Sequence, residues 1–266
     1  MIIELSYGPS STQCIIFIDD QVTSVQKLDS SSNMRVAFKT MMSGKTCPIG
    51  DNPPTFNNLS ATGTVSNGTY TKVEYNIVFD KNGWYLTYSV TKTCPPGWTK
   101  FSRPTTEWCM MNIIDVNEAF TLDYANNACA QFNAVVSGLE TTEEQSFVSD
   151  AGLAAIQGTG KTRSAFWVSG QRRAECYEDG YQSLTYCNNI KEGFTFDDKY
   201  LTNYGGYKWA PDQPDGDAVG YWQNCMQLWI TSSDTDLYQS IDDTGCSSMC
   251  PGDYCYIGFP CGKPAG

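Results

Sequence analysis

The side chains that could do chemistry in this chain are oxygen ligands. Carboxylates and amides occur close together in two segments, Trp209-Ala-Pro-Asp-Gln213-Pro214-Asp215 and Ile241-Asp242-Asp243-Thr-Gly-Cys246. The chain has no histidine, which removes the usual general base, the commonest zinc ligand and every Ser-His or Cys-His catalytic arrangement. A chain with 29 acidic and 17 basic residues can still bind a hard cation, because calcium prefers carboxylate and carbonyl oxygens.

Neither segment identifies a site by itself, because Gln213-Pro214-Asp215 and Asp242-Asp243 are each typical of solvated turns. The pattern Gly158-Thr-Gly160-Lys161-Thr162 is similar to the end of a phosphate-binding loop, but Ala155 stands where that loop requires its first glycine. No pair of carboxylates is specified as the acid and the nucleophile of a glycosidase. We therefore expect a binding protein and no enzyme.

The twelve cysteines indicate disulfides formed in an oxidising, extracellular compartment. Disulfides are favoured over a zinc site at Cys246, Cys250 and Cys255, because the chain offers no histidine ligand. Sequons at Asn58 and Asn67 predict glycosylation and also favour secretion. No apolar run approaches the roughly 20 residues that span a bilayer, and no signal-peptide pattern is present, so we expect a secreted, mature chain. The formal charge of −12 would repel a phosphate backbone, so nucleic acid is not an expected partner.

The elements that must position these residues fall into two parts. Alternating apolar residues over 70–79 and 84–90 predict two strands, and Asn82-Gly83 between them favours the tight turn of a hairpin. Further strands are expected at 14–18 and 34–38. Residues 1–92 are therefore predicted to form a small β-rich domain.

Helical spacing predicts two helices in the second part, residues 93–266. Apolar residues recur at helical spacing between 125 and 132 behind Thr121, and Thr141-x-x-Glu144 has the form of a capping box. From residue 166 onward, short apolar runs separated by Gly, Asp, Asn and Pro predict strands and long loops. Helices before strands are typical of an α+β fold.

The order of several motifs resembles the C-type lectin domain, and specifically its secreted nematode members. The two acidic segments stand in family order with Cys94-Pro-Pro-Gly-Trp98, Phe166-Trp167-Val-Ser-Gly170, Tyr221-Trp222-Gln-Asn-Cys225 and Gly258-Phe-Pro-Cys261-Gly-Lys-Pro264. The resemblance covers about residues 93 to 266. It implies two helices, short antiparallel sheets and a long ligand-binding loop. The domain before it is similar to the small CW relative of PAN domains.

The resemblance implies a calcium site formed by Gln213, Asp215, Asp242 and Asp243. In the family, a loop with a cis-proline and a paired Asn-Asp on a core strand hold one calcium ion. Three carboxylates brought within a few ångströms repel one another unless a cation lies between them. Calcium takes about 6 to 8 oxygens, so four side chains leave positions for two adjacent sugar hydroxyls.

The same resemblance implies a galactose-type ligand, because Gln-Pro-Asp reverses the donor and acceptor pattern of the mannose-type Glu-Pro-Asn. The expected sugar contacts are Gln213, Asp215, Asp242, Tyr221 and Trp222. Either aromatic ring would stack against the apolar face of the sugar. Three positions depart from the family pattern, with Ile241 in place of tryptophan, Asp242 in place of asparagine and Gln223 in place of glutamate. Loss of the charge at Gln223 should lower the affinity for calcium.

The long form of the domain implies the bridges Cys94–Cys109, Cys129–Cys261 and Cys225–Cys246. Additional local bridges are expected between Cys176 and Cys187, Cys250 and Cys255, and Cys14 and Cys47. The expected function is that of a secreted, calcium-dependent lectin for galactose-type glycans, with a role in innate immunity. The alternative is a C-type lectin-like scaffold for protein contacts or extracellular assembly, including a homo-oligomer, and the departures at Gln223 and Ile241 motivate it.

Overall fold

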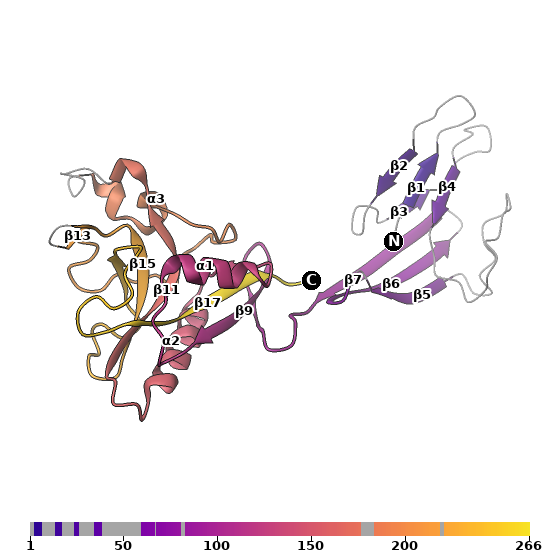
Figure 1. Ribbon diagram of the computed structural model, residues 1–266. Helices are drawn as coiled ribbons and strands as arrows, with labels where there is room; N and C mark the ends of the chain where they lie inside the picture. Colours follow the sequence, from indigo (N-terminus) through magenta and orange to yellow (C-terminus); the bar gives the residue numbers. More distant parts are fainter. Residues whose placement is uncertain are drawn as a thin grey trace. The chain divides into compact units, whose positions relative to one another are not determined.

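The computed structural model divides into two compact units, residues 1–93 with Gly266, and residues 94–265 (Figure 1). The structure describes residues 3–6, 14–17, 24–26, 35–38, 60–66, 68–80, 83–176, 184–218 and 221–266. Of the predicted features, Cys47 and the sequon asparagines Asn58 and Asn67 lie outside these residues. The CW/PAN-like identity of the first unit stays a prediction.

In the described residues of the first unit, the strands form two antiparallel sheets. One has the order β2 (Cys14–Phe17), β1 (Ile3–Ser6) and β4 (Arg35–Phe38). The other has the order β3 (Ser24–Gln26), β7 (Gly83–Lys92), β6 (Thr71–Asp80) and β5 (Ser60–Ser66). Strands β6 and β7 form the predicted hairpin, with Thr71 opposite Lys92 and Asp80 opposite Gly83. Val73 and Leu86 are buried on one face of this sheet, as the alternating pattern predicts.

The second unit is built on one large sheet. Its main strand order is β16 (Ile241–Thr244), β15 (Cys225–Thr231), β11 (Arg163–Arg172), β17 (Tyr256–Pro264), β9 (Glu107–Ile114) and β8 (Thr99–Ser102). Two short strands join it, β10 (Val135–Val136) beside β17 and β12 (Phe194–Thr195) beside β11. The pairing is antiparallel except between β11 and β17. A separate ribbon pairs β13 (Asp217–Ala218) with β14 (Tyr221–Trp222).

Both predicted helices are present and begin at the predicted caps. Helix α1 (Leu122–Ala130) follows Thr121, whose hydroxyl accepts from the Tyr124 N–H. Helix α2 (Thr142–Ile156) follows Thr141, whose hydroxyl accepts from the Glu144 N–H, and it packs against β15, β17 and β9. A third, short helix, α3 (Ile190–Gly193), was not expected, and Asn189 caps it by accepting two backbone N–H bonds. The α+β C-type lectin fold is confirmed, with this addition.

Five of the six predicted disulfides are present in the described residues, and all five join the predicted cysteines. They are Cys94–Cys109, Cys129–Cys261, Cys176–Cys187, Cys225–Cys246 and Cys250–Cys255. Cys225 and Cys246 lie at the start of β15 and just after β16, so their bridge fixes the edge of the sheet that carries the acidic pair. Within the described part of the chain, no helix is long and apolar enough to cross a membrane.

A buried ion network joins helix α2 to the segments that follow β8 and β12. The guanidinium of Arg103 donates to both carboxylate oxygens of Glu144 at 2.7 and 2.8 Å and to Asp198 at 2.8 and 3.0 Å. All three side chains are fully buried, and Arg103 also lies 4.3 Å above the ring of Trp108. Because buried charges are tolerated only when paired and hydrogen-bonded, each member of this network requires the others.

Candidate functional site

The loop that carries the first acidic segment is shaped by its backbone. The Gln213–Pro214 peptide is cis, as the resemblance implies, and Asp212 and Gly216 on either side have φ values of 63° and 72°. The Gln213 N–H donates to the carbonyl of Ala210 at 3.1 Å, which closes a turn before the proline. The N–H of Ala210 in turn donates to the carbonyl of Ile241 at 2.8 Å, so the start of the loop is hydrogen-bonded to strand β16.

Asp243 fastens the far end of the loop to the sheet. It lies on β16 with 1% of its surface exposed. Its Oδ2 accepts from the N–H of Gly216 at 2.8 Å, and its Oδ1 accepts from the N–H of Asp215 at 3.2 Å. A carboxylate that accepts two adjacent backbone N–H groups fixes the direction of that backbone, because both bonds are charge-assisted.

Three polar side chains meet where this loop reaches the surface. Gln223 donates from Nε2 to Oδ1 of Asp215 at 2.9 Å, and its N–H donates to the carbonyl of Gly216 at 3.0 Å. Oε1 of Gln213 accepts from the Asp215 N–H at 2.9 Å. Asp215 is exposed, and the other two side chains are partly exposed. Gln223, interpreted from the sequence as a lost charge, is therefore part of the loop's hydrogen-bond network.

Arg172 is the residue of this site that the sequence did not indicate. It ends strand β11, is 1% exposed, and its Nη2 donates to Oδ2 of Asp243 in a fully buried ion pair. Its Nε also donates to the carbonyl of Gln223 at 3.1 Å, so the guanidinium links Asp243 on β16 to the backbone just after β14. The ion pair links residues 71 positions apart, and no local pattern predicts such a contact.

Asp242 lies beside Asp243 in sequence but is directed elsewhere. Its Oδ2 accepts from Trp229 Nε1 at 3.2 Å and from Gln227 Nε2 at 3.3 Å, both on strand β15. Its Oδ1 is buried without a hydrogen-bond partner. Burial, followed by the negative charge of Asp243, raises the pKa of Asp242 to about 7. Burial also raises the pKa of Asp243 to about 6, although the positive charge of Arg172 opposes this.

The four predicted ligands do not form one cage. Successive residues of a strand point to opposite faces, and Asp242 binds β15 side chains while Asp243 binds Arg172 and the loop amides. A second cation on Asp243 would be repelled by the guanidinium already there. No group of three or more His, Cys, Asp or Glu residues is placed to hold a metal ion in the part of the chain that the structure describes. The arrangement does not fit one calcium ion bound by all four side chains, and calcium binding stays a prediction.

The predicted aromatic contacts are placed only by their backbone. Tyr221 and Trp222 form β14, opposite Ala218 and Asp217 of β13, and this ribbon directly follows the Gln213–Gly216 loop. Their side chains lie outside the described part of the structure. Stacking of either ring on a sugar therefore stays a prediction.

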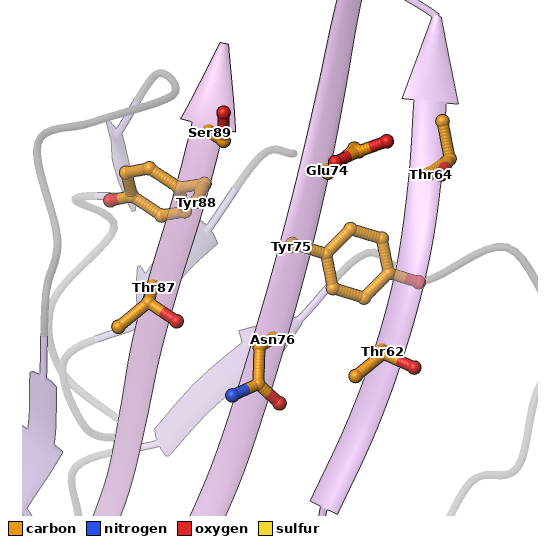
Figure 2. Close-up of a pocket in the computed structure, with 8 residues that line it drawn as sticks. All are labelled: Thr62, Thr64, Glu74, Tyr75, Asn76, Thr87, Tyr88 and Ser89. Carbon is orange, nitrogen blue, oxygen red and sulfur yellow. The ribbon is translucent and has the colours of Figure 1, made fainter.

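A shallow hollow of about 550 Å³ lies on the four-stranded sheet of the first unit (Figure 2). Its polar residues form two rows across β5, β6 and β7, namely Thr62, Asn76 and Thr87, and Thr64, Glu74 and Ser89. Glu74 is paired with Lys72 at 2.7 Å. Hydroxyls and amides on an open sheet face are typical of a solvated surface, so we assign no ligand to this hollow.

Comparison with solved structures finds C-type carbohydrate-recognition domains. That of cow CD23, determined in the presence of a GlcNAc2Man3 oligosaccharide, is 16% identical over 66% of this chain and 98% of its own, with a TM-score of 0.40. The mouse scavenger receptor C-type lectin domain is 15% identical over 65% of this chain and 100% of its own, with a TM-score of 0.39. SPL-1 in a GlcNAc complex is 18% identical over 64% of this chain and 94% of its own, with a TM-score of 0.40.

A comparison with curated proteins finds no match. Among protein families, the one described as C-type lectin domain-containing protein 141/158 matches residues 98–264, which is more than half of the chain. This range includes the cis-proline loop, the acidic pair on β16 and nine of the ten cysteines that form the described disulfides, all but Cys94. The chain belongs to the C-type lectin domain-containing protein 141/158 family.

Proposed function

We propose that this protein is a secreted lectin that binds glycans at the Gln213–Gly216 loop. The observation that carries the proposal is the surface cluster of Gln213, Asp215 and Gln223, held by the buried carboxylate of Asp243. Membership of the C-type lectin domain family supports it. The five disulfides support secretion, because such bridges persist in oxidising compartments.

The cluster offers what two adjacent sugar hydroxyls require. A hydroxyl can donate its proton to the exposed carboxylate of Asp215 and accept from the amide of Gln213 or Gln223. Because the loop backbone is already hydrogen-bonded to Asp243, ordering the loop costs little at the moment of binding. Galactose or N-acetylgalactosamine is the proposed ligand type, from the resemblance of Gln213-Pro214-Asp215, with Tyr221 or Trp222 stacked on the ring.

Binding to immobilised galactose and N-acetylgalactosamine tests the proposal. Asp215→Asn should weaken binding at least tenfold, because it removes the carboxylate that accepts from a sugar hydroxyl. Asp212→Asn is the matched control, since Asp212 is an exposed acid of the same loop whose positive φ asparagine also adopts. Equal retention of the two variants, or no retention of the wild-type protein on any glycan of an array, would refute the proposal.

The predicted requirement for calcium is tested in the same assay. Elution by EDTA, reversed by added calcium, would support a calcium-dependent lectin. Retention that is unchanged in EDTA would show that the loop binds glycans without the ion. Asp215→Asn and Asp212→Asn are compared both in EDTA and in calcium. A calcium requirement appears as a difference between the two buffers, whereas a role of Asp215 in glycan binding appears as a difference between the two variants.

The second candidate function is a C-type lectin-like scaffold for protein contacts or assembly. The observation that favours it is the Arg172–Asp243 ion pair, which uses the carboxylate that the calcium-dependent mechanism requires. A native chain that binds no glycan but sediments as an oligomer, and loses that state when the loop is changed, would support this function.

A further inference from the structure

The base of the loop contains a positive charge that belongs to the chain itself. We propose that the guanidinium of Arg172 is the built-in cation of this site and holds the Gln213–Gly216 loop in its binding conformation without a metal ion. That the held conformation serves glycan binding rests on the proposed function, but that Arg172 holds the loop does not. Arg172 is a positioning residue, because it acts on the loop through Asp243.

The position of the guanidinium is fixed from several sides. The backbone N–H of Arg172 donates to the carbonyl of Asn224 at 2.7 Å, and the side-chain Nε donates to the carbonyl of Gln223 at 3.1 Å. The guanidinium carbon lies 4.9 Å from the centre of the Phe194 ring. With 1% of its surface exposed, Arg172 is part of the interior rather than a mobile surface cation.

Asp243 passes this constraint to the loop. Its Oδ2 accepts from Nη2 of Arg172 and from the N–H of Gly216, and its Oδ1 accepts from the N–H of Asp215. Without Arg172 the carboxylate would be a buried charge with no counter-charge among its hydrogen-bond donors. It would then either take up a proton or draw in water, and both changes weaken its hold on the two loop amides.

The consequence for recognition is independence from calcium. An arginine keeps its proton at every physiological pH and cannot be removed by a chelator. A loop held in this way should have the same conformation in EDTA and in millimolar calcium. The sugar-binding residues Gln213 and Asp215 would then be preorganised by an ion pair within the chain.

Hydrogen exchange of the Asp215 and Gly216 amides tests the inference directly. In the wild-type chain we expect both amides to exchange slowly. Their rates should be the same in EDTA and in about 5 mM calcium. Arg172→Met keeps the apolar part of the side chain and removes its charge, so exchange in EDTA should become at least tenfold faster. Arg173→Met is the matched control, because it removes the same charge from the next residue, which bonds through its backbone to Gly193.

Two results would overturn the inference. One is slow exchange of the wild-type amides only when calcium is added, and the other is equal exchange in Arg172→Met and Arg173→Met. If Arg172→Met does not fold, Arg172→Gln, which keeps side-chain N–H donors but removes the charge, takes its place, and exchange at least threefold faster than in the wild type is expected. Exchange as slow as in the wild type would then count against the inference. Loss of glycan binding by every form, with the exchange results as expected, would refute the proposed function alone.

Discussion

The replacement Asp242→Asn should remove a dependence of stability on pH. Asp242 has an ordinary pKa of 3.8, and burial together with the charge of Asp243 raises it to about 7 in the folded chain. The folded state therefore binds this proton more tightly than the unfolded state. The contribution to stability is complete at acid pH and is lost as the pH rises through the folded pKa of about 7.

The size of the effect follows from the two pKa values. Their difference, at about 1.36 kcal/mol per pKa unit, gives a total of about 4 kcal/mol, of which about 2.5 kcal/mol falls between about pH 5 and pH 8. Asparagine does not titrate, so this part of the slope should disappear in Asp242→Asn. A smaller slope of the same sign remains, because the pKa of Asp243 is also raised, to about 6.

Urea unfolding in EDTA, followed by tryptophan fluorescence, measures both slopes. The free energy of unfolding of the wild type, minus that of Asp242→Asn, should decrease by about 2.5 kcal/mol between about pH 5 and about pH 8. Subtracting the variant removes the titration of all groups that the two proteins share. A difference that is constant with pH, or that increases, would refute the interpretation of Asp242 as a buried, partly protonated acid.

Two further replacements test the packing that supports the site. Arg103→Met should lower the free energy of unfolding by about 3–5 kcal/mol, because it leaves Glu144 and Asp198 buried without their counter-charge; a loss below about 1 kcal/mol in urea unfolding would contradict this. Replacing both Cys129 and Cys261 by serine removes a bridge across 132 positions and should cost about 2–5 kcal/mol, and a melting temperature equal to that of the wild type would contradict this.

Local features of the fold could be predicted from the sequence. Thr121 and Thr141 cap helices through contacts within three residues, so the cap residue and the helix start are visible in a short stretch of chain. The hairpin of β6 and β7 is equally local, because alternation and a tight turn specify it. The disulfide pairs and the cis-proline loop came from the family resemblance, which supplies contacts between distant residues.

The interior of the candidate site could not be predicted in the same way. The contact of Arg172 with Asp243 depends on β11 and β16 lying on either side of β15, and no residue pattern near either one specifies that order. The opposite directions of Asp242 and Asp243 could have been anticipated, because adjacent residues of a strand alternate between faces. The short helix α3 depends on one asparagine cap within a loop-like stretch.

The proposed function depends on glycan binding at the Gln213–Gly216 loop. An NMR titration of the labelled chain with N-acetylgalactosamine tests it most directly, since the backbone amide of each loop residue reports separately. We expect chemical shifts to change at Gln213, Asp215, Gly216 and Gln223 and to follow one saturation curve. Shift changes confined to other residues, or none at millimolar sugar, would contradict it.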